Sequence, residues 1–482
     1  MDVHIFFLPF LAPGHMIPMT DLAKLLAGRG VKATIVTTTA NASRVQPALD
    51  GSPHLDVTLL TLPFLPSVPE NVTSLPTPGL TPEFIAGLNS LKSSFERLLV
   101  EHRPDCIISD VFYPWTGDLA AEHGIPRIAF HGTGSFVFSV GAAIRRFKPH
   151  EIASADDEPF LLPGLPHRVE LCRSQLMGGM DGSDELMNQM TESYMKKTYG
   201  DVMNTFHEME PGYADQLSKK TWLVGPVSLC NRDATERAVR GGGGGGQENE
   251  FDRCLDWLDS KSAGSVLYAC FGSLGQFSSS QLGEIAGGLN SSGRPFVWVV
   301  RNNAGYDDTS EWMPEGFEEE EGLVIRGWAP QMLILSHPAV GGFMTHCGWN
   351  SCMEGASAGV PMVTWPLFAE QFFNERLLVD VLGIGVAVGS KVCSNVVEER
   401  TFVSREQVRK AVEEVMGGGE EADERRKSAR EVAEMARRAV EEGGSSYNGL
   451  SSLIQELRDI KAGDAALSEN VVTGLTQREL IE

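Results

Sequence analysis

The sequence predicts an α/β protein made of two successive parallel-sheet halves. Short apolar segments alternate with helical segments of about ten residues, which is the pattern of strands joined by crossover helices. The alternation weakens in the region before residue 250 and restarts after it. The chain has 482 residues, enough for two or three domains that each bury a core of their own.

The N-terminal half opens with a buried strand rather than a targeting segment. HIFFLPFLA (4–12) is apolar, but no Lys or Arg precedes it and Pro-Gly-His ends it. A helical pattern without clear strands is expected over LMNQMTESYMKKTYGDVMNTF (186–206). The other expected elements of this half are a helix at 19–30, a strand at 32–39, a strand at 105–112, a helix near 115–124 and a strand at 126–132.

The C-terminal half repeats the pattern and ends in amphipathic helices. Strands are expected at 264–273, 295–301, 323–328, 341–346 and 359–367, with a helix at 279–293 and final helices at 426–442 and 448–460.

Six consecutive glycines, Gly241 to Gly246, separate the halves and favour a flexible connection, with a mobile loop inside one domain as the alternative. The predicted division is an N-terminal domain at 1–240, a Gly-rich linker at 241–250, a C-terminal domain at 251–462 whose last helix packs back on the first domain, and a disordered tail at 463–482.

Composition limits the possible partners. There are 40 Lys and Arg against 64 Asp and Glu, a net charge of −24, which argues against nucleic acid and anionic membranes as partners. The eight cysteines form no Cys-x-x-Cys pair, and no apolar run of about 18 residues occurs. We therefore expect reduced thiols, no membrane span and a soluble, cytoplasmic monomer.

The segment CGWNSCMEGASAG (347–359) follows an apolar strand and opens a helix. Free N–H groups and the helix dipole make such a helix start an anion site. Ser351 and Glu354 also match a Ser-x-x-Glu capping box, which needs no ligand, so local pattern leaves both hypotheses open. No Gly-x-Gly-x-x-Gly follows a strand, and there is no P-loop motif and no Asp-x-Asp pair. A bound diphosphate would therefore depend on backbone amides, hydroxyls and a histidine.

The 44-residue stretch from Trp328 to Gln371, with its WAPQ, HCGWNS and terminal Glu-Gln, resembles the signature box of plant family 1 UDP-sugar glycosyltransferases. The similarity extends over about residues 1–460 and includes the GHMIP, SDVFYPW and CFGS segments. It implies the GT-B architecture, in which two Rossmann-like domains face each other across a cleft.

The resemblance also implies a donor site for a UDP-sugar. Trp328 would stack on uracil beside Ala329 and Gln331, and Glu354 would accept hydrogen bonds from both ribose hydroxyls. Glu370 and Gln371 would hold the sugar. The remaining expected donor residues are Ser273, His346, Asn350 and Ser351 at the diphosphate, with Thr133 and Trp349 near the sugar.

In this family the histidine after the first strand is the general base, which here is His15. Its partner would be Asp110, an arrangement similar to the His–Asp pair of hydrolytic triads. Asp118 is the nearest competitor and is expected to be a helix residue, while His4 is expected to be structural. Pro13 stands where the family usually has a small or polar residue, which would reshape the acceptor entrance.

The predicted activity is inverting transfer of glucose from UDP-glucose to a hydroxyl of a small hydrophobic plant metabolite, giving a β-glucoside. Flavonoids, other phenolics and terpenoids all suit the apolar segments around 64–90, 134–150 and 176–200. No metal or other cofactor is expected. Alternatives are another UDP-sugar donor, a hydrolase on the same fold, and a sugar-nucleotide binding protein without catalysis.

Overall fold

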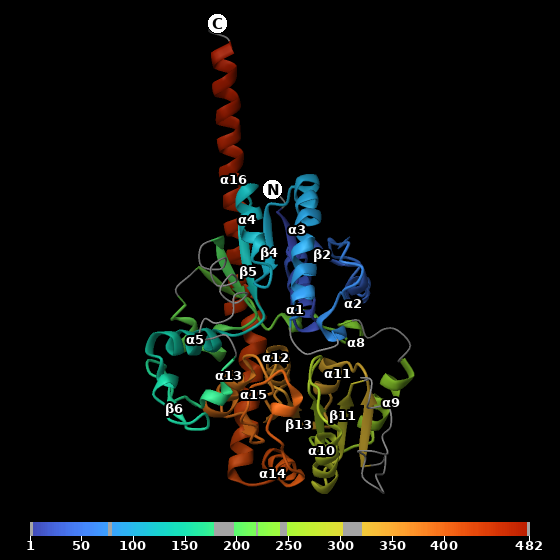
Figure 1. Ribbon diagram of the computed structural model, residues 1–482. Helices are drawn as coiled ribbons and strands as arrows, with labels where there is room; N and C mark the ends of the chain where they lie inside the picture. The colour runs from blue at the N-terminus through green and yellow to red at the C-terminus, as the bar shows by residue number, and fades with distance from the viewer. Residues whose placement is uncertain are drawn as a thin grey trace.

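The computed structural model describes residues 3–75, 80–177, 197–217, 220–241, 248–301 and 321–479. These residues form two α/β domains, one above the other in Figure 1, with helices α1, α8, α11 and α12 near the boundary between them. Most of the predicted linker, from residue 242 to residue 247, lies outside the described residues.

The N-terminal domain is built on a seven-stranded sheet in the order β3-β2-β1-β4-β5-β8-β9, and all of its pairings are parallel. Central strands are largely apolar and largely buried, as expected for strands covered by helices on both faces. The strands are β1 His4–Leu8, β2 Lys32–Thr38, β3 Val57–Leu62, β4 Cys106–Asp110, β5 Arg127–His131, β8 Gly200–Met203 and β9 Thr221–Leu223.

The prediction of a helical pattern over 186–206 is wrong for its described end. Residues 178–196 lie outside the described part, but Gly200–Met203 forms β8, paired with β5 on one side and β9 on the other. Two neighbouring strands satisfy its backbone groups, and this tertiary pairing outweighs the local helical pattern.

Helices cover both faces of this sheet. They are α1 Pro13–Ala27, α2 Thr39–Asp50, α3 Pro82–His102, α4 Trp115–Glu122, α5 Ser135–Phe147, α7 Pro211–Ala214 and α8 Ala234–Val239. A small antiparallel hairpin, β6 Phe160–Leu161 and β7 Glu170–Leu171, stands apart from the sheet. Short turns of 3-10 or π helix are Val72–Ser74, Pro149–Glu151, Arg173–Gln175, His207–Met209, Val227–Cys230, Leu377–Val381 and Val397–Glu399.

The C-terminal domain has a six-stranded parallel sheet in the order β12-β11-β10-β13-β14-β15. Its strands are β10 Val266–Cys270, β11 Phe296–Val300, β12 Gly322–Arg326, β13 Val340–Thr345, β14 Met362–Thr364 and β15 Gly385–Ala387. Its helices are α9 Glu248–Asp259, α10 Ser279–Ser291, α11 Gln331–Leu335, α12 Trp349–Ala358, α13 Gln371–Arg376, α14 Arg405–Met416 and α15 Glu420–Val440.

The last helix, α16 Ser445–Glu479, returns to the N-terminal domain and runs along it in Figure 1. Leu450, Leu453 and Leu457 of α16 belong to the apolar core around β1 and β9. The backbone continues as helix past Gly463, the position at which the sequence predicts the start of a tail.

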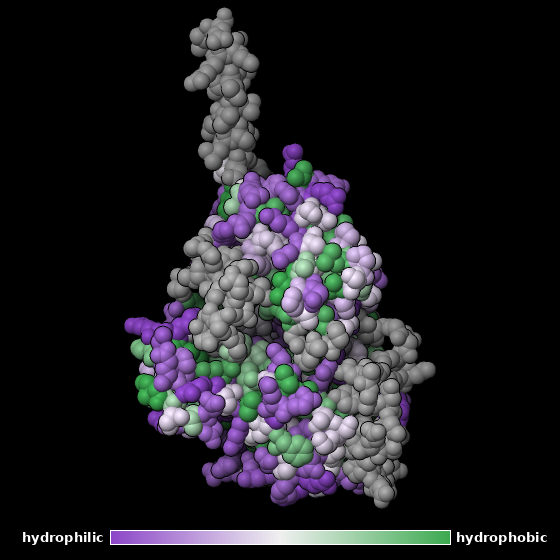
Figure 2. Space-filling view, viewed as in Figure 1, coloured by the Kyte–Doolittle hydropathy of each residue, from purple (hydrophilic) through white to green (hydrophobic). Residues whose placement is uncertain are grey.

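The surface is largely polar on the face drawn in Figure 2, where hydrophobic residues form scattered patches. Among the described residues, no helix combines the length and the apolar character needed to cross a membrane.

Candidate active site

A cavity of about 580 Å³ lies between the two domains, within the range of small-molecule sites. In both domains the cavity is lined by residues that follow the carboxyl ends of parallel strands. Open α/β sheets bind ligands at these strand ends. All the site residues predicted from the sequence line it except Asp110 and Thr133. Those that line it are His15, Ser273, Trp328, Ala329, Gln331, His346, Trp349, Asn350, Ser351, Glu354, Glu370 and Gln371.

His15 lies in the first turn of α1, directly after β1. Pro13 occupies the first helical position, where proline's missing N–H costs nothing, so the unusual residue in this sequence suits the start of the helix. His15 Nδ1 is 2.7 Å from Asp110 Oδ2, and the imidazole packs edge-on against Phe10 and Phe112. Its side chain is 31% exposed, on the cavity side.

Asp110 ends β4 and is 1% exposed. Its second oxygen accepts a hydrogen bond from the Phe112 backbone N–H at 3.2 Å, which fixes the carboxylate toward His15. An ionised carboxylate can only accept, so His15 Nδ1 carries a proton and Nε2 keeps a lone pair for the cavity.

Burial by itself would lower the pKa of His15. The charge of Asp110, its hydrogen bond and the charge of Glu370 outweigh burial, and the pKa of His15 is raised overall. Burial raises the pKa of Glu370, and the charge of His15 partly opposes this. His15 and Glu370, from opposite domains, therefore lie close enough to influence each other across the cavity.

The competing residues named from the sequence have structural roles. Asp118 lies in α4, is half exposed and pairs with Lys197. His4 Nε2 is hydrogen-bonded to Thr34 Oγ1 at 2.8 Å within the sheet.

The start of α12 does not form the capping box that the Ser-x-x-Glu pattern allows. The N-cap is Gly348, without a side-chain cap, so Ser351 lies inside the helix at its third position. Ser351 Oγ accepts from Gln331 Nε2 at 3.1 Å, and Glu354 Oε2 accepts from the same nitrogen at 2.7 Å. The capping hypothesis is wrong because the N-cap lies three residues before Ser351, so that Trp349, Asn350 and Ser351, which line the cavity, form the first turn of the helix.

His346 is wedged between two glycines beside this helix start. A Cβ on Gly272, where φ is +71°, would lie 2.3 Å from the imidazole, and a Cβ on Gly348 would also lie 2.3 Å from it. Burial, helped by the charge of Arg301, lowers the pKa of His346 to about 4. A neutral imidazole can donate a hydrogen bond to a phosphate but supplies no positive charge.

Arg301, one residue after β11, lines the same end of the cavity and was not identified from the sequence. Burial lowers its pKa to about 10, so it remains charged at neutral pH. Among the described residues no hydrogen-bond or acidic partner holds its guanidinium. Arg301 could have been found from the sequence as a basic residue at the carboxyl end of a predicted strand, where open α/β sheets bind ligands.

At the end of the cavity expected to hold the nucleoside, Trp328 follows β12 and its ring lies against Gly241. A Cβ on Gly241, where φ is +84°, would lie 2.4 Å from Trp328 Cζ2. Any larger residue at this first position of the linker would therefore clash with the indole. The Trp328 Nε1 is buried without a partner among the described residues.

At the end of the cavity expected to hold the sugar, Glu370 and Gln371 open α13, just after Ala369 with its left-handed φ of +54°. Gln371 Oε1 accepts from the backbone N–H groups of Leu367 at 2.9 Å and Phe368 at 3.1 Å. Its acceptor is therefore used within the loop, and its NH₂ is left to donate to a ligand.

Thr133 lies in the turn between β5 and α5, and its hydroxyl is buried without a partner among the described residues. The turn is held by Glu210, which accepts from the N–H groups of Ser135 and Phe136. Neighbouring Gly132 lines the cavity although Thr133 does not.

Both domains contribute apolar lining to the cavity. Of the three segments predicted to shape the acceptor site, 64–90 contributes directly, 134–150 does not reach the cavity, and 178–196 of the third lies outside the described residues. Apolar lining residues from the N-terminal domain are Phe10, Val72, Leu75, Leu80, Ile85 and Phe112.

Residues of the signature box make hydrogen bonds that join the two domains. Asn350 Nδ2 donates to Gly14 O at 2.7 Å, and Trp349 Nε1 donates to Asn204 O at 2.7 Å. Within the described part of the chain, no group of three or more His, Cys, Asp or Glu is arranged to hold a metal ion.

Comparisons with known proteins agree with this geometry. A family model described as UDP-glucoronosyl and UDP-glucosyl transferase matches residues 249–420. Scopoletin glucosyltransferase from Nicotiana tabacum is 46% identical over 477 residues, covering 95% of this chain and 98% of that protein. Anthocyanin 3'-O-beta-glucosyltransferase from Gentiana triflora is 43% identical over 481 residues, covering 95% of this chain and 98% of that protein.

Solved structures give the same result. Glycyrrhiza uralensis UGT73P12, complexed with glycyrrhetinic acid 3-O-monoglucuronide, superposes with a TM-score of 0.91 at 40% identity, covering 99% of this chain and 100% of that chain. Medicago truncatula UGT71G1, complexed with UDP-glucose, gives a TM-score of 0.77 at 26% identity, covering 95% of this chain and 98% of that chain. The chain therefore belongs to the plant family 1 UDP-sugar glycosyltransferases and is a transferase with the GT-B fold.

Proposed function

We propose that the protein transfers glucose from UDP-glucose to a hydroxyl of a small hydrophobic acceptor with inversion at the anomeric carbon. The observation that carries the proposal is His15, which is bound to Asp110 through Nδ1 and directs Nε2 into a cavity bounded on the other side by the start of α12.

In this reaction neutral His15 Nε2 takes the proton of the acceptor hydroxyl as its oxygen attacks the anomeric carbon. The bond from that carbon to the diphosphate oxygen breaks, and UDP leaves with the electron pair. Attack opposite an α-linked leaving group gives a β-glycoside. The imidazolium that forms is stabilised by the buried charge of Asp110.

The departing diphosphate would be bound without help from a charged histidine. The free N–H groups of α12 and the hydroxyls of Ser273 and Ser351 face it, and Arg301 supplies positive charge. His346 is neutral, so it can contribute a hydrogen bond to the diphosphate but no positive charge.

The apolar lining around Phe10 and Phe112 favours a planar or polycyclic acceptor. The named relatives act on scopoletin and on an anthocyanin, so we propose a phenolic, flavonoid or triterpenoid acceptor for this chain. We also propose a cytoplasmic location, since all eight cysteines are free thiols.

Incubation with UDP-glucose and a panel of such acceptors, followed by mass spectrometry, tests the proposal. We expect an acceptor gain of one hexose, and a loss in kcat of about 10²–10⁴-fold in His15→Ala, with UDP affinity hardly changed. Release of free glucose without transfer would favour a hydrolase, and UDP binding without turnover would favour a binding protein.

A further inference from the structure

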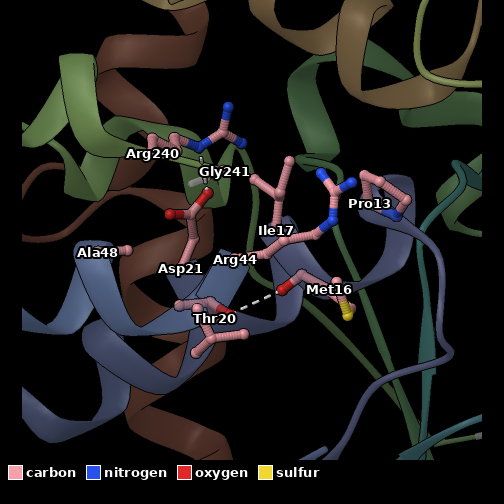
Figure 3. Close-up of a pocket in the computed structure, with 10 residues that line it drawn as sticks. Pro13, Met16, Ile17, Thr20, Asp21, Arg44, Ala48, Arg240 and Gly241 are labelled. Atoms are coloured by element: carbon pink, nitrogen blue, oxygen red, sulfur yellow. Dashed lines mark hydrogen bonds and ion pairs between the residues drawn. The ribbon is translucent and has the colours of Figure 1, made fainter. Parts of the chain in front are cut away.

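Arg240 joins the two domains at the nucleoside end of the cavity. It follows α8 and is 9% exposed. Its Nε donates to Asp21 Oδ2 in α1 at 2.7 Å, and its Nη1 donates to Glu354 Oε1 in α12 at 2.5 Å. Figure 3 shows its guanidinium directed at the Asp21 carboxylate, with Gly241 beside it.

The N-terminal side of this bridge is built into the domain. Asp21 Oδ1 accepts from Asn231 Nδ2 at 2.9 Å, and Asn231 Oδ1 accepts from Lys24 Nζ at 2.9 Å. Burial would lower the pKa of Arg240, but the charges of Asp21 and Glu354 outweigh burial and raise it. The guanidinium is thus a fixed cation whose position follows α1.

The bonding of Glu354 leaves room for a ligand. Arg240 takes one lone pair of Oε1, and Gln331 takes one of Oε2 at 2.7 Å. A carboxylate has about four acceptor positions, so each oxygen keeps one. Two adjacent hydroxyls, as on a ribose, present the two donors that match these positions.

We propose that Arg240 is a positioning residue for the donor. Arg240 fixes Glu354 so that the two open acceptor positions of the carboxylate meet the ribose hydroxyls. Through Asp21, Arg240 also ties this carboxylate to the helix that carries His15. The inference rests on the proposed function. Asp21 lies six residues after His15 on α1, about 9 Å along the helix axis, so one rigid helix carries both the base and the anchor of the donor carboxylate.

The test measures the Kd of UDP and of 2′-deoxy-UDP by calorimetry. Because a hydrogen bond to a charged group is lost with the 2′-hydroxyl, wild-type protein should bind UDP at least about tenfold more tightly than 2′-deoxy-UDP. In Arg240→Met this ratio should fall toward one and UDP itself should bind at least about tenfold more weakly. The double variant Arg240→Met, Glu354→Gln should bind UDP no more weakly than Glu354→Gln alone.

Arg237→Met is the matched control, since Arg237, in α8 just before Arg240, also lines the cavity and reaches the second domain, donating to Asn231 O at 3.2 Å and to Ser336 Oγ at 3.4 Å, without contacting Glu354. It should keep the wild-type ratio. Arg240→Lys keeps the charge without the two-pronged geometry and should give an intermediate ratio. If thermal melting shows that Arg240→Met does not fold, Arg240→Lys and Asp21→Asn, which should also lower the ratio, carry the test.

The outcomes separate this inference from the proposed function. If Glu354→Gln leaves both the ratio and UDP affinity unchanged, the proposed ribose site is wrong and the role of Arg240 is wrong with it. If Glu354→Gln removes the ratio while the Arg240 variants keep it, only the role of Arg240 is wrong. Tighter UDP binding by Arg240→Met would show that Arg240 competes with the ribose and would also overturn the inference.

Discussion

Replacing Asp110 by Asn should slow the reaction and move its pH dependence in a defined direction. The active form of His15 is neutral, so activity falls as the pH decreases through the pKa of His15, which lies above 6.5. Asp110→Asn removes the main influence that raises this pKa, while burial continues to lower it and Glu370 alone opposes burial. The acid limb of kcat/KM should therefore move to lower pH.

The plateau of kcat should fall as well. Asp110 is 1% exposed and its bond to His15 is 2.7 Å long, so the imidazolium formed in the transition state depends on this carboxylate. A hydrogen bond to a charged group is worth about 1.5–3 kcal/mol, which corresponds to about 10- to 150-fold in rate. Asn keeps the shape and an acceptor oxygen but not the charge, so a complete loss of activity is not expected.

The assay is a pH–rate profile from pH 5 to pH 9 with one acceptor and saturating UDP-glucose. Asp118→Asn is the control, because Asp118 is half exposed and pairs with Lys197 away from the cavity. It should keep the wild-type profile. An Asp110→Asn protein with the wild-type acid limb and plateau would falsify the role of Asp110 as partner of the base.

Three further outcomes are expected. Arg301→Gln should weaken UDP binding by about 10- to 150-fold in calorimetry, because it removes a charged donor from the diphosphate, and should leave uridine binding unchanged; equal loss for both ligands would contradict this. Activity should be complete in excess EDTA, because the sequence has no Asp-x-Asp pair, and loss restored by Mg²⁺ or Mn²⁺ would overturn the diphosphate site. UDP-glucose should exceed UDP-galactose by about 5- to 150-fold in kcat/KM, since an inverted hydroxyl leaves Gln371 or Glu370 unpaired, and UDP-glucuronate should do worse because Glu370 repels it. Equal use of the three donors would show that these residues do not set the choice.

The two sheets could be predicted because the sequences of their central strands are short apolar segments. His4–Leu8, Cys106–Asp110 and Val340–Thr345 are buried on both faces, and burial on both faces removes the need for polar residues. Gly200–Met203 and Gly385–Ala387 carry no such signal. They are strands because a neighbouring strand already offers a free edge, which is a property of the assembled sheet.

The sequence predicts which residues of the signature box line the cavity, but not the hydrogen bonds that these residues make. Residues 328–371 lie together in the sequence, and the carboxyl ends of adjacent parallel strands bring them together in space. Which hydrogen bonds they make is decided by distant residues. The bridge from Glu354 to Arg240 spans 114 positions, and Gln371 loses its acceptor to the loop before α13.

The signature box therefore serves the interface as well as the ligand. His15 stands on one domain and the expected donor residues other than Thr133 stand on the other, while direct displacement needs the reacting atoms about 3–3.5 Å apart. Trp349, Asn350 and Glu354 each bond to the first domain, through Asn204, Gly14 and Arg240 respectively. Two of these bonds are to backbone carbonyls, which any sequence offers, whereas the third needs the pair formed by Arg240 and Asp21. Alignment of base and donor thus depends in part on a charged side chain outside the box, at the last residue before the glycine run.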